Sequence, residues 1–135
     1  MATTIIFNGT EIRISSKKVG TAKPWGEKWE KQHHKVTVTT DKKSVTFDFY
    51  CNDNRLKKQD LISAFECFLS DGIAYKNAED ILDFANEFGY ETNSRENRER
   101  LRNTWNACKE SWEKWQGFYI DPYDLANWLR DTYEI

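Results

Sequence analysis

The segment TTIIFNGTEIRI, residues 3–14, decides the first part of the fold. Its centre is Asn8-Gly9, the pair preferred in a two-residue type I′ turn because both central residues take positive φ angles. The flanking runs are rich in β-branched residues and predict two antiparallel strands. This turn sets Ile5 opposite Ile12 and gives the hairpin one apolar face. That face consists of Ile5, Phe7, Ile12 and Ile14.

Residues 33–52, HHKVTVTTDKKSVTFDFYCN, predict a second hairpin. A tight turn at Asp41-Lys42 places Val38 opposite Val45 and keeps the apolar side chains on one face. Further pairs in this register are Val36 with Phe47, His34 with Phe49 and, on the polar face, Lys35 with Asp48. Agreement between register and pattern is what an antiparallel sheet with one buried face requires.

The segment between the hairpins, residues 15–32, contains Gly20, Pro24 and Gly26 and predicts an irregular excursion. Its centre, KPWGEKW, places tryptophan among lysines, which is a composition found at protein interfaces. The candidate partner-binding residues here are Trp25, Lys28 and Trp29. The alternative is that the tryptophan pair folds back and covers the edge of the sheet.

After Cys51 the apolar period changes from two to about 3.6, which predicts helices. The first spans roughly 57–70, with Gly72 just beyond its end. The second spans roughly 78–88, with Asn77 as N-cap and Gly89 after its last turn. The third spans roughly 95–116 after Ser94, and the fourth begins at Asp121-Pro122.

The third predicted helix carries one apolar seam, made of Leu101, Trp105, Cys108, Trp112 and Trp115. Steps of four and three residues place these side chains on a single stripe. The stripe predicts packing along the whole helix against the sheet, another helix or a second copy of the chain. A homodimer through Trp105, Trp112 and Trp115 therefore remains one interpretation.

These patterns predict one α+β domain over residues 1–135, with about four antiparallel strands packed against about four helices. Residues 1–52 would form the two hairpins and residues 53–135 the helical part. The length of 135 residues suffices for one hydrophobic core. The rings, six Trp, six Tyr and eight Phe, either fill that core or are displayed to a partner.

Charge is distributed unevenly along the chain. Residues 1–52 hold nine Lys/Arg against five Asp/Glu, a balance of +4, and residues 53–135 hold eleven against seventeen, a balance of −6. An acidic row in the middle is a candidate partner-binding surface that would imitate nucleic-acid phosphates. Its members are Asp80, Asp83, Glu87 and Glu91. The alternative is a solvated helix face.

The stretch FANEFGYETNSRENRERL, residues 84–101, raises the alternative of a helix-turn-helix that binds nucleic acid. Arg95, Arg98 and Arg102 share one face of the following helix and would contact phosphates. Three features weigh against DNA reading: a long interval from Gly89 to Ser94, a helix of about 22 residues, and an acidic preceding helix. We also expect Glu91 to pair with Arg95 and Glu99 to pair with Arg102.

No sequence motif points to catalysis, a cofactor or a metal. The chain lacks GxSxG, P-loop and GxGxxG patterns, and the strand register sends His33 and His34 to opposite faces. We therefore expect a protein that is not an enzyme. The cysteines show no CxxC spacing, and we expect Cys67 and Cys108 as core residues in a reducing cytosol. Neither a secretory signal nor a membrane-spanning apolar run is found.

Three segments together resemble a family of small proteins of phages and other mobile elements: VTFDFYCN, AFECFLSD, and FANEFGYETNSR leading into WNACKES. The most specific part is the corner from Glu87 to Thr92 with Ser94 and Arg95. The resemblance covers roughly residues 33–116 and not the first hairpin or the last helix. It implies an accessory protein that acts in the cytosol of an infected or lysogenic bacterium.

From these observations we expect a non-catalytic inhibitor of a bacterial defence system, of the anti-CRISPR type, that occludes a protein surface. Its partner would be a host protein or a defence ribonucleoprotein complex. The second hypothesis is a nucleic-acid-binding accessory or regulatory protein that uses Arg95, Arg98 and Arg102. The two differ in salt dependence, because phosphate contacts release counterions.

Overall fold

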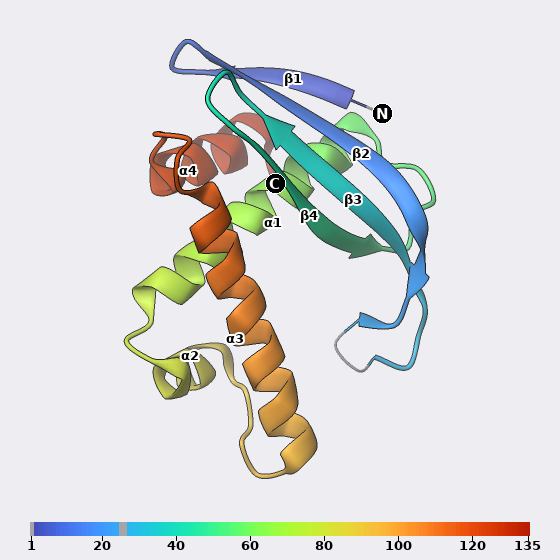
Figure 1. Ribbon diagram of the computed structural model, residues 1–135, viewed down its shortest axis with the longest axis vertical. Coiled ribbons are helices and arrows are strands. Elements are labelled where there is room, and N and C mark those ends of the chain that lie inside the picture. The colour runs from blue at the N-terminus through green and yellow to red at the C-terminus, as the bar shows by residue number, and fades with distance from the viewer. Residues whose placement is uncertain (1, 25–26) are drawn as a thin grey trace.

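The computed structural model describes residues 2–24 and 27–135, which form one four-stranded antiparallel sheet and four helices (Figure 1). The strands lie in the order β1-β2-β3-β4. Their bounds are β1 (Ala2–Phe7), β2 (Thr10–Ala22), β3 (Lys31–Thr39) and β4 (Ser44–Cys51). The helices are α1 (Lys58–Asn77), α2 (Ile81–Phe88), α3 (Arg95–Trp115) and α4 (Pro122–Tyr133). The α+β prediction is confirmed.

Both predicted hairpins have the expected register. Asn8 and Gly9 have φ angles of 49° and 82°, as a type I′ turn requires. Ile5 pairs with Ile12 in the first hairpin, and the second repeats every predicted pair from Val38–Val45 to His34–Phe49. The side chains facing the helices are buried, whereas the other face of the sheet is largely exposed.

The segment between the hairpins differs from the prediction of an irregular excursion. β2 continues to Ala22 and pairs with β3 as far as Ala22–Lys31. The register shifts between Lys18 and Gly20, where Gly20 has a φ of 144°. A bulge at this glycine lets the strand bend and continue, since β3 satisfies its backbone hydrogen bonds. The glycine therefore marks a bulge rather than the end of the strand.

The first helix is longer than predicted, because Gly72 lies inside α1 instead of ending it. Gly72 is buried where α1 passes α3, next to the backbone of Trp112. The second helix is shorter at its start, because Asp80 and not Asn77 is its N-cap. Gly89 ends α2 in the left-handed conformation, as predicted.

The last two helices begin as predicted. The Ser94 hydroxyl accepts a hydrogen bond from the Asn97 N–H, and the Asp121 carboxylate accepts one from the Tyr123 N–H. In the α3 seam, Leu101, Cys108 and Trp115 are buried, whereas Trp105 and Trp112 are half-buried. The seam packs against α1 and α2 of the same chain. This packing gives the predicted homodimer no support.

The buried side chains form two clusters. The larger one lies between the sheet, α1, α4 and the end of α3. The smaller one joins the end of α1, α2 and the first part of α3, within residues 74–108, which we call the arm. Figure 1 shows the arm extending away from the sheet. Surfaces on the arm are thus displayed at a distance from the main core.

Candidate functional site

The acidic row lies on the arm, and all four of its carboxylates are exposed. Two of them cap α2: the Asp80 carboxylate accepts from the Asp83 N–H at 2.8 Å, and the Asp83 carboxylate accepts from the Glu79 N–H at 2.9 Å. Glu87 forms no ion pair with any described residue. Glu91 receives only a 3.4 Å hydrogen bond from the Asn97 amide. The row therefore combines helix capping with a negative surface that no described cation neutralises.

An exposed apolar side chain on α2, beside the acidic row, was not singled out from the sequence. Leu82 is 61% exposed on α2, adjacent to Asp83. At about 100° per residue it lies on the side of the helix opposite Phe84 and at the edge of the buried stripe beside Ala85. The helical spacing opposite Phe84 was the sequence signal that could have indicated its exposure. An exposed leucine among acids is the kind of group that gains free energy when a partner covers it.

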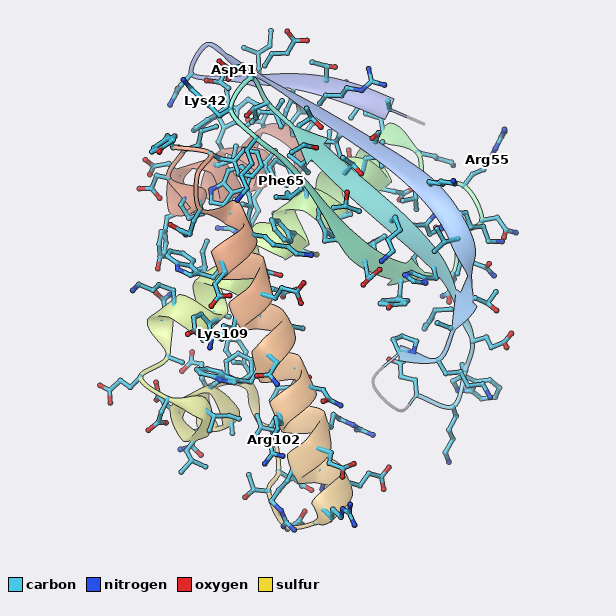
Figure 2. All side chains as sticks on the ribbon, viewed as in Figure 1. Asp41, Lys42, Arg55, Phe65, Arg102 and Lys109 are labelled. Carbon is cyan, nitrogen blue, oxygen red and sulfur yellow. The ribbon has the colours of Figure 1, made fainter. Side chains whose placement is uncertain are left out.

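The arginines of the nucleic-acid alternative are exposed near the start of α3, and Figure 2 shows Arg102 on the arm. Arg95 pairs with Glu99 at 3.1 Å, and the Arg98 guanidinium donates to the Thr92 carbonyl at 3.1 Å. These contacts differ from the predicted pairs of Glu91 with Arg95 and Glu99 with Arg102. Within a helix the i,i+4 spacing of Arg95 and Glu99 brings their side chains together.

The tryptophan loop, the connection between Ala22 and Lys31 that contains Lys28 and Trp29, follows the last pair of β2 and β3. Lys28 is exposed and Trp29 is 78% exposed, which favours contact over a role in covering the sheet edge. Trp25 lies outside the described residues, so its predicted role stays a prediction. In Figure 1 α2 and the end of β2 lie on opposite sides of α3, so the loop and the acidic row do not form one continuous surface.

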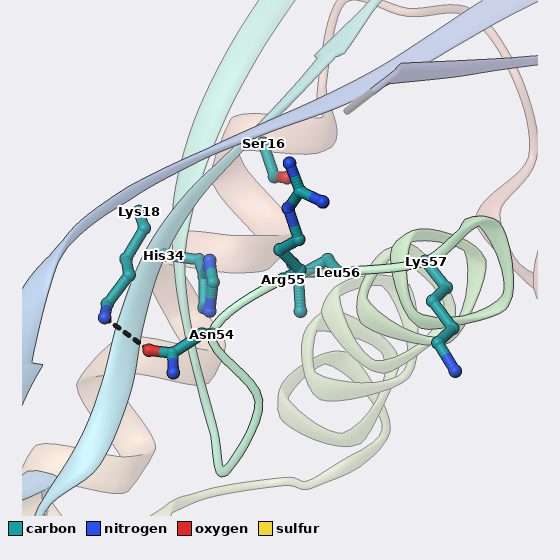
Figure 3. A pocket seen from close by; sticks show the side chains of 7 residues that line it. All are labelled: Ser16, Lys18, His34, Asn54, Arg55, Leu56 and Lys57. Carbon is teal, nitrogen blue, oxygen red and sulfur yellow. Dashed lines mark hydrogen bonds between the residues drawn. The ribbon is translucent and has the colours of Figure 1, made fainter.

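A hollow of about 550 Å³ lies where the β4–α1 connection crosses β2 and β3 (Figure 3). It is lined by Ser16, Lys18, His34, Asn54, Arg55, Leu56 and Lys57. Lys18 donates to the Asn54 amide oxygen at 2.5 Å, and the buried His34 ring bonds the Asp53 carbonyl at 2.8 Å. Lys18, Arg55 and Lys57 give it a basic lining.

Sequence reasoning missed this hollow because three separate segments build it. The side chains that line it do not aim at one point: in Figure 3 Lys18 turns toward Asn54, whereas Arg55 extends toward Ser16. Such an arrangement lacks the converging nucleophile, base and orienting group that catalysis requires. We treat it as a basic surface feature.

The histidines and cysteines do not form a metal-binding cluster, although the His34 ring and the Cys51 thiol both hydrogen-bond the Asp53 carbonyl. His34 is buried beneath the sheet, whereas His33 on the opposite face hydrogen-bonds Asp48 at 2.8 Å. No group of three potential ligands is close enough to hold a metal ion in the part of the chain that the structure describes. Among these described residues, no helix combines the length and apolarity needed to cross a membrane.

Cys108 is buried as predicted, but Cys67 is exposed, which corrects its prediction as a core residue. It lies on the side of α1 that borders a groove beside β4, where side chains leave the surface open. Although the Cys67 residue is exposed, partial desolvation of its thiol raises the pKa of Cys67 to about 11, and burial raises that of Cys108 to about 12. Neither thiol is therefore activated as a nucleophile at neutral pH.

No protein-family model matches the chain, and comparison with curated proteins and solved structures gave no match. The resemblance to phage and mobile-element proteins thus stays an expectation that these comparisons leave open. Function has to be inferred from the surfaces themselves.

Proposed function

We propose that this protein is a non-catalytic interaction protein that binds a protein partner through the outer face of α2. One observation carries the proposal: Leu82 is 61% exposed on a helix that also carries exposed carboxylates with no ion pair to any described residue. An apolar centre with a charged rim is typical of a binding hot spot. The extension of the arm from the sheet presents this face to a partner (Figure 1).

The expected partner surface follows from this chemistry. It would be basic, with an apolar hollow that accepts Leu82, since opposite charges steer the encounter and exclude wrong partners. Protein surfaces that bind nucleic-acid phosphates are basic in this way. The finer proposal, an inhibitor of a bacterial defence complex of the anti-CRISPR type that acts in the bacterial cytosol by occlusion, is supported by the resemblance of residues 33–116.

The experiment expresses the chain in bacteria that carry an active CRISPR system and measures plaque formation by a targeted phage. We expect the wild-type chain to restore plaques and Leu82→Asp or Glu87→Lys to reduce them. Ile6→Asp is the matched control, because Ile6 is 66% exposed on the sheet, away from the arm. Unchanged immunity across a panel of CRISPR types would contradict the anti-CRISPR proposal.

The proposal of partner binding by α2 is tested separately from the defence assignment. Crosslinking in the host lysate should retain any captured partner in the Ile6→Asp variant and lose it in Leu82→Asp. If both variants retain the same partner equally, another surface carries the interaction. Circular dichroism and thermal unfolding of each variant establish that the helix is intact.

The second candidate is nucleic-acid binding by Arg95, Arg98 and Arg102, which is favoured by their exposure along the start of α3. Gel shifts at 50 to 200 mM salt distinguish it. Three phosphate contacts predict a slope of about −3 in log affinity against log salt. Replacing all three arginines by glutamine should remove that binding, whereas an affinity that salt leaves unchanged would exclude it.

A further inference from the structure

β4 is an edge of the sheet, and half of its backbone groups point away from β3. The Thr40 N–H donates to the Lys43 carbonyl in the turn between β3 and β4. Along an antiparallel ladder, hydrogen-bonded pairs alternate with pairs whose backbone groups point away from the partner strand. By this alternation Thr46 and Asp48 direct their N–H and C=O groups outward. The hydrogen bond from the Lys114 ammonium to the Thr46 carbonyl, at 2.9 Å, confirms that this carbonyl points away from β3. No described residue hydrogen-bonds the outward backbone groups of Asp48.

A groove of about 430 Å³ runs beside this edge, between β4, α1 and α3. Phe47 stacks on Phe68 at its base with ring centroids 4.4 Å apart. Ala107 and Ser111 on α3 are small, which leaves room beside the strand. Side chains from a strand added to β4 would alternate between this groove and the open face of the sheet.

The groove is unequally charged. Two carboxylates at its rim have partners, since Asp48 pairs with Lys35 at 2.5 Å and Glu110 pairs with Lys114 at 2.9 Å. Asp71 has no cation partner among the described residues and lies near a second carboxylate, that of Glu66. Although the Asp71 residue is exposed to solvent, partial desolvation of its carboxyl, and then this neighbour, raise its pKa to about 6. A cation entering the groove would favour the charged carboxylate and so offset these unfavourable effects.

We propose that β4 accepts an extended segment of a protein partner as a fifth strand, with a lysine or arginine of that segment directed toward Asp71. Backbone hydrogen bonds at Asp48 supply part of the affinity, and the basic side chain supplies the selectivity. This surface is separate from α2, so the two proposals fail independently.

The probe is a set of eight synthetic octapeptides of alternating valine and threonine, with one lysine moved through each position in turn. Each is N-methylated on alternate amides, so that only one edge can pair with β4. Binding is measured by titration calorimetry, and amide NMR locates it. We expect one or two lysine positions to bind and to slow hydrogen exchange at the Asp48 amide. An isomer methylated on the other set of amides should not bind.

Two variants test the groove. Asp71→Asn should weaken binding of the best lysine peptide about tenfold and leave its norleucine analogue unchanged, because only the ionic contact is lost. Ala107→Leu should fill the groove and block both peptides. Asn103→Leu, an exposed position one turn earlier on α3, is the matched control and should bind as the wild type does.

Three results would overturn the proposal: no binding by any peptide at millimolar concentration, binding that neither Asp71→Asn nor Ala107→Leu alters, or protection of the Asp48 amide by self-association without peptide. The last result, seen by sedimentation, would assign this edge to a second copy of the chain instead.

Discussion

Gly72 in α1 faces the backbone of Trp112 in α3 so closely that a Cβ at residue 72 would lie 3.0 Å from the Trp112 Cα and N atoms. These are backbone atoms, so no side-chain rotation relieves the contact. The glycine sets the separation of the two longest helices. That separation also fixes how α1 and α3 flank β4 and the position of the arm relative to the sheet.

We expect Gly72→Ala to lower the free energy of unfolding by about 1 kcal/mol, and Gly72→Val by about 3 kcal/mol. The alanine variant gains about 1 kcal/mol in helix propensity, which offsets part of the overpacking. Urea unfolding followed by circular dichroism measures both. A Gly72→Ala variant more stable than the wild type would contradict the close helix contact.

The α3 tryptophans should differ in their contribution to stability. Trp115 is 3% exposed, stacks on Phe118 with centroids 4.2 Å apart and donates to the Ile120 carbonyl at 2.8 Å. We expect Trp115→Ala to lower the free energy of unfolding by about 3–5 kcal/mol. Trp112→Ala, at a half-buried ring, should cost less. Chemical denaturation measures both variants. If the two substitutions lower the free energy of unfolding equally, the prediction that the half-buried Trp112 contributes less than Trp115 is wrong.

The carboxyl of Asp71 should make stability fall as pH rises from about 4 to about 6. Its pKa is raised from 3.8 to about 6 on folding, so in this interval the folded state binds more protons than the unfolded state. The contribution of Asp71 to the free energy of unfolding is least unfavourable below its pKa in the unfolded state. It reaches its full penalty above its pKa in the folded state. Asp71→Asn should remove this pH dependence.

The measurement is the difference in unfolding free energy between the wild type and Asp71→Asn across pH 3.5–7. The difference is needed because Asp48 titrates in the opposite sense. Burial raises the pKa of Asp48, but hydrogen bonds from Lys35 and His33 outweigh that effect and hold it below its usual value. A difference that stays constant with pH would contradict the raised pKa of Asp71.

The cysteines should react with iodoacetamide in an order set by access and thiolate content. Cys67 is exposed but, with a pKa of about 11, should react more slowly at pH 8 than a free thiol and faster as pH rises. Cys108 is buried and should react only after unfolding. Mass spectrometry of timed digests separates the sites. Early labelling of Cys108 would indicate local opening of the arm.

Local patterns were sufficient for the hairpins and most helix ends. Asn8-Gly9 fixed one turn by its φ requirement, and the alternation from His34 to Phe49 fixed the second register, because a slip of one residue would expose the apolar side chains. Ser94 and Asp121 capped their helices as predicted, since capping involves residues two or three apart. These features depend only on near neighbours in the chain.

Glycine gave the wrong signal wherever its role was tertiary. Gly20 and Gly72 both indicated the end of an element, yet one sits in a bulge inside β2 and the other in the middle of α1. In each case a distant segment decides: β3 pairs with the strand past the bulge, and α3 approaches the helix too closely for a side chain. A sequence pattern does not contain those distances.

The same division holds for the candidate surfaces. The sequence by itself determined the strand registers, the helix caps, the acidic row and the exposed arginines, because each follows from periodicity within one segment. Only the tertiary structure decided that Leu82 stands exposed among the acids, that Cys67 faces a groove, and that Asp71 lies beside the open edge of β4. Exposure and proximity depend on which segments pack against one another, and that is settled by long-range packing.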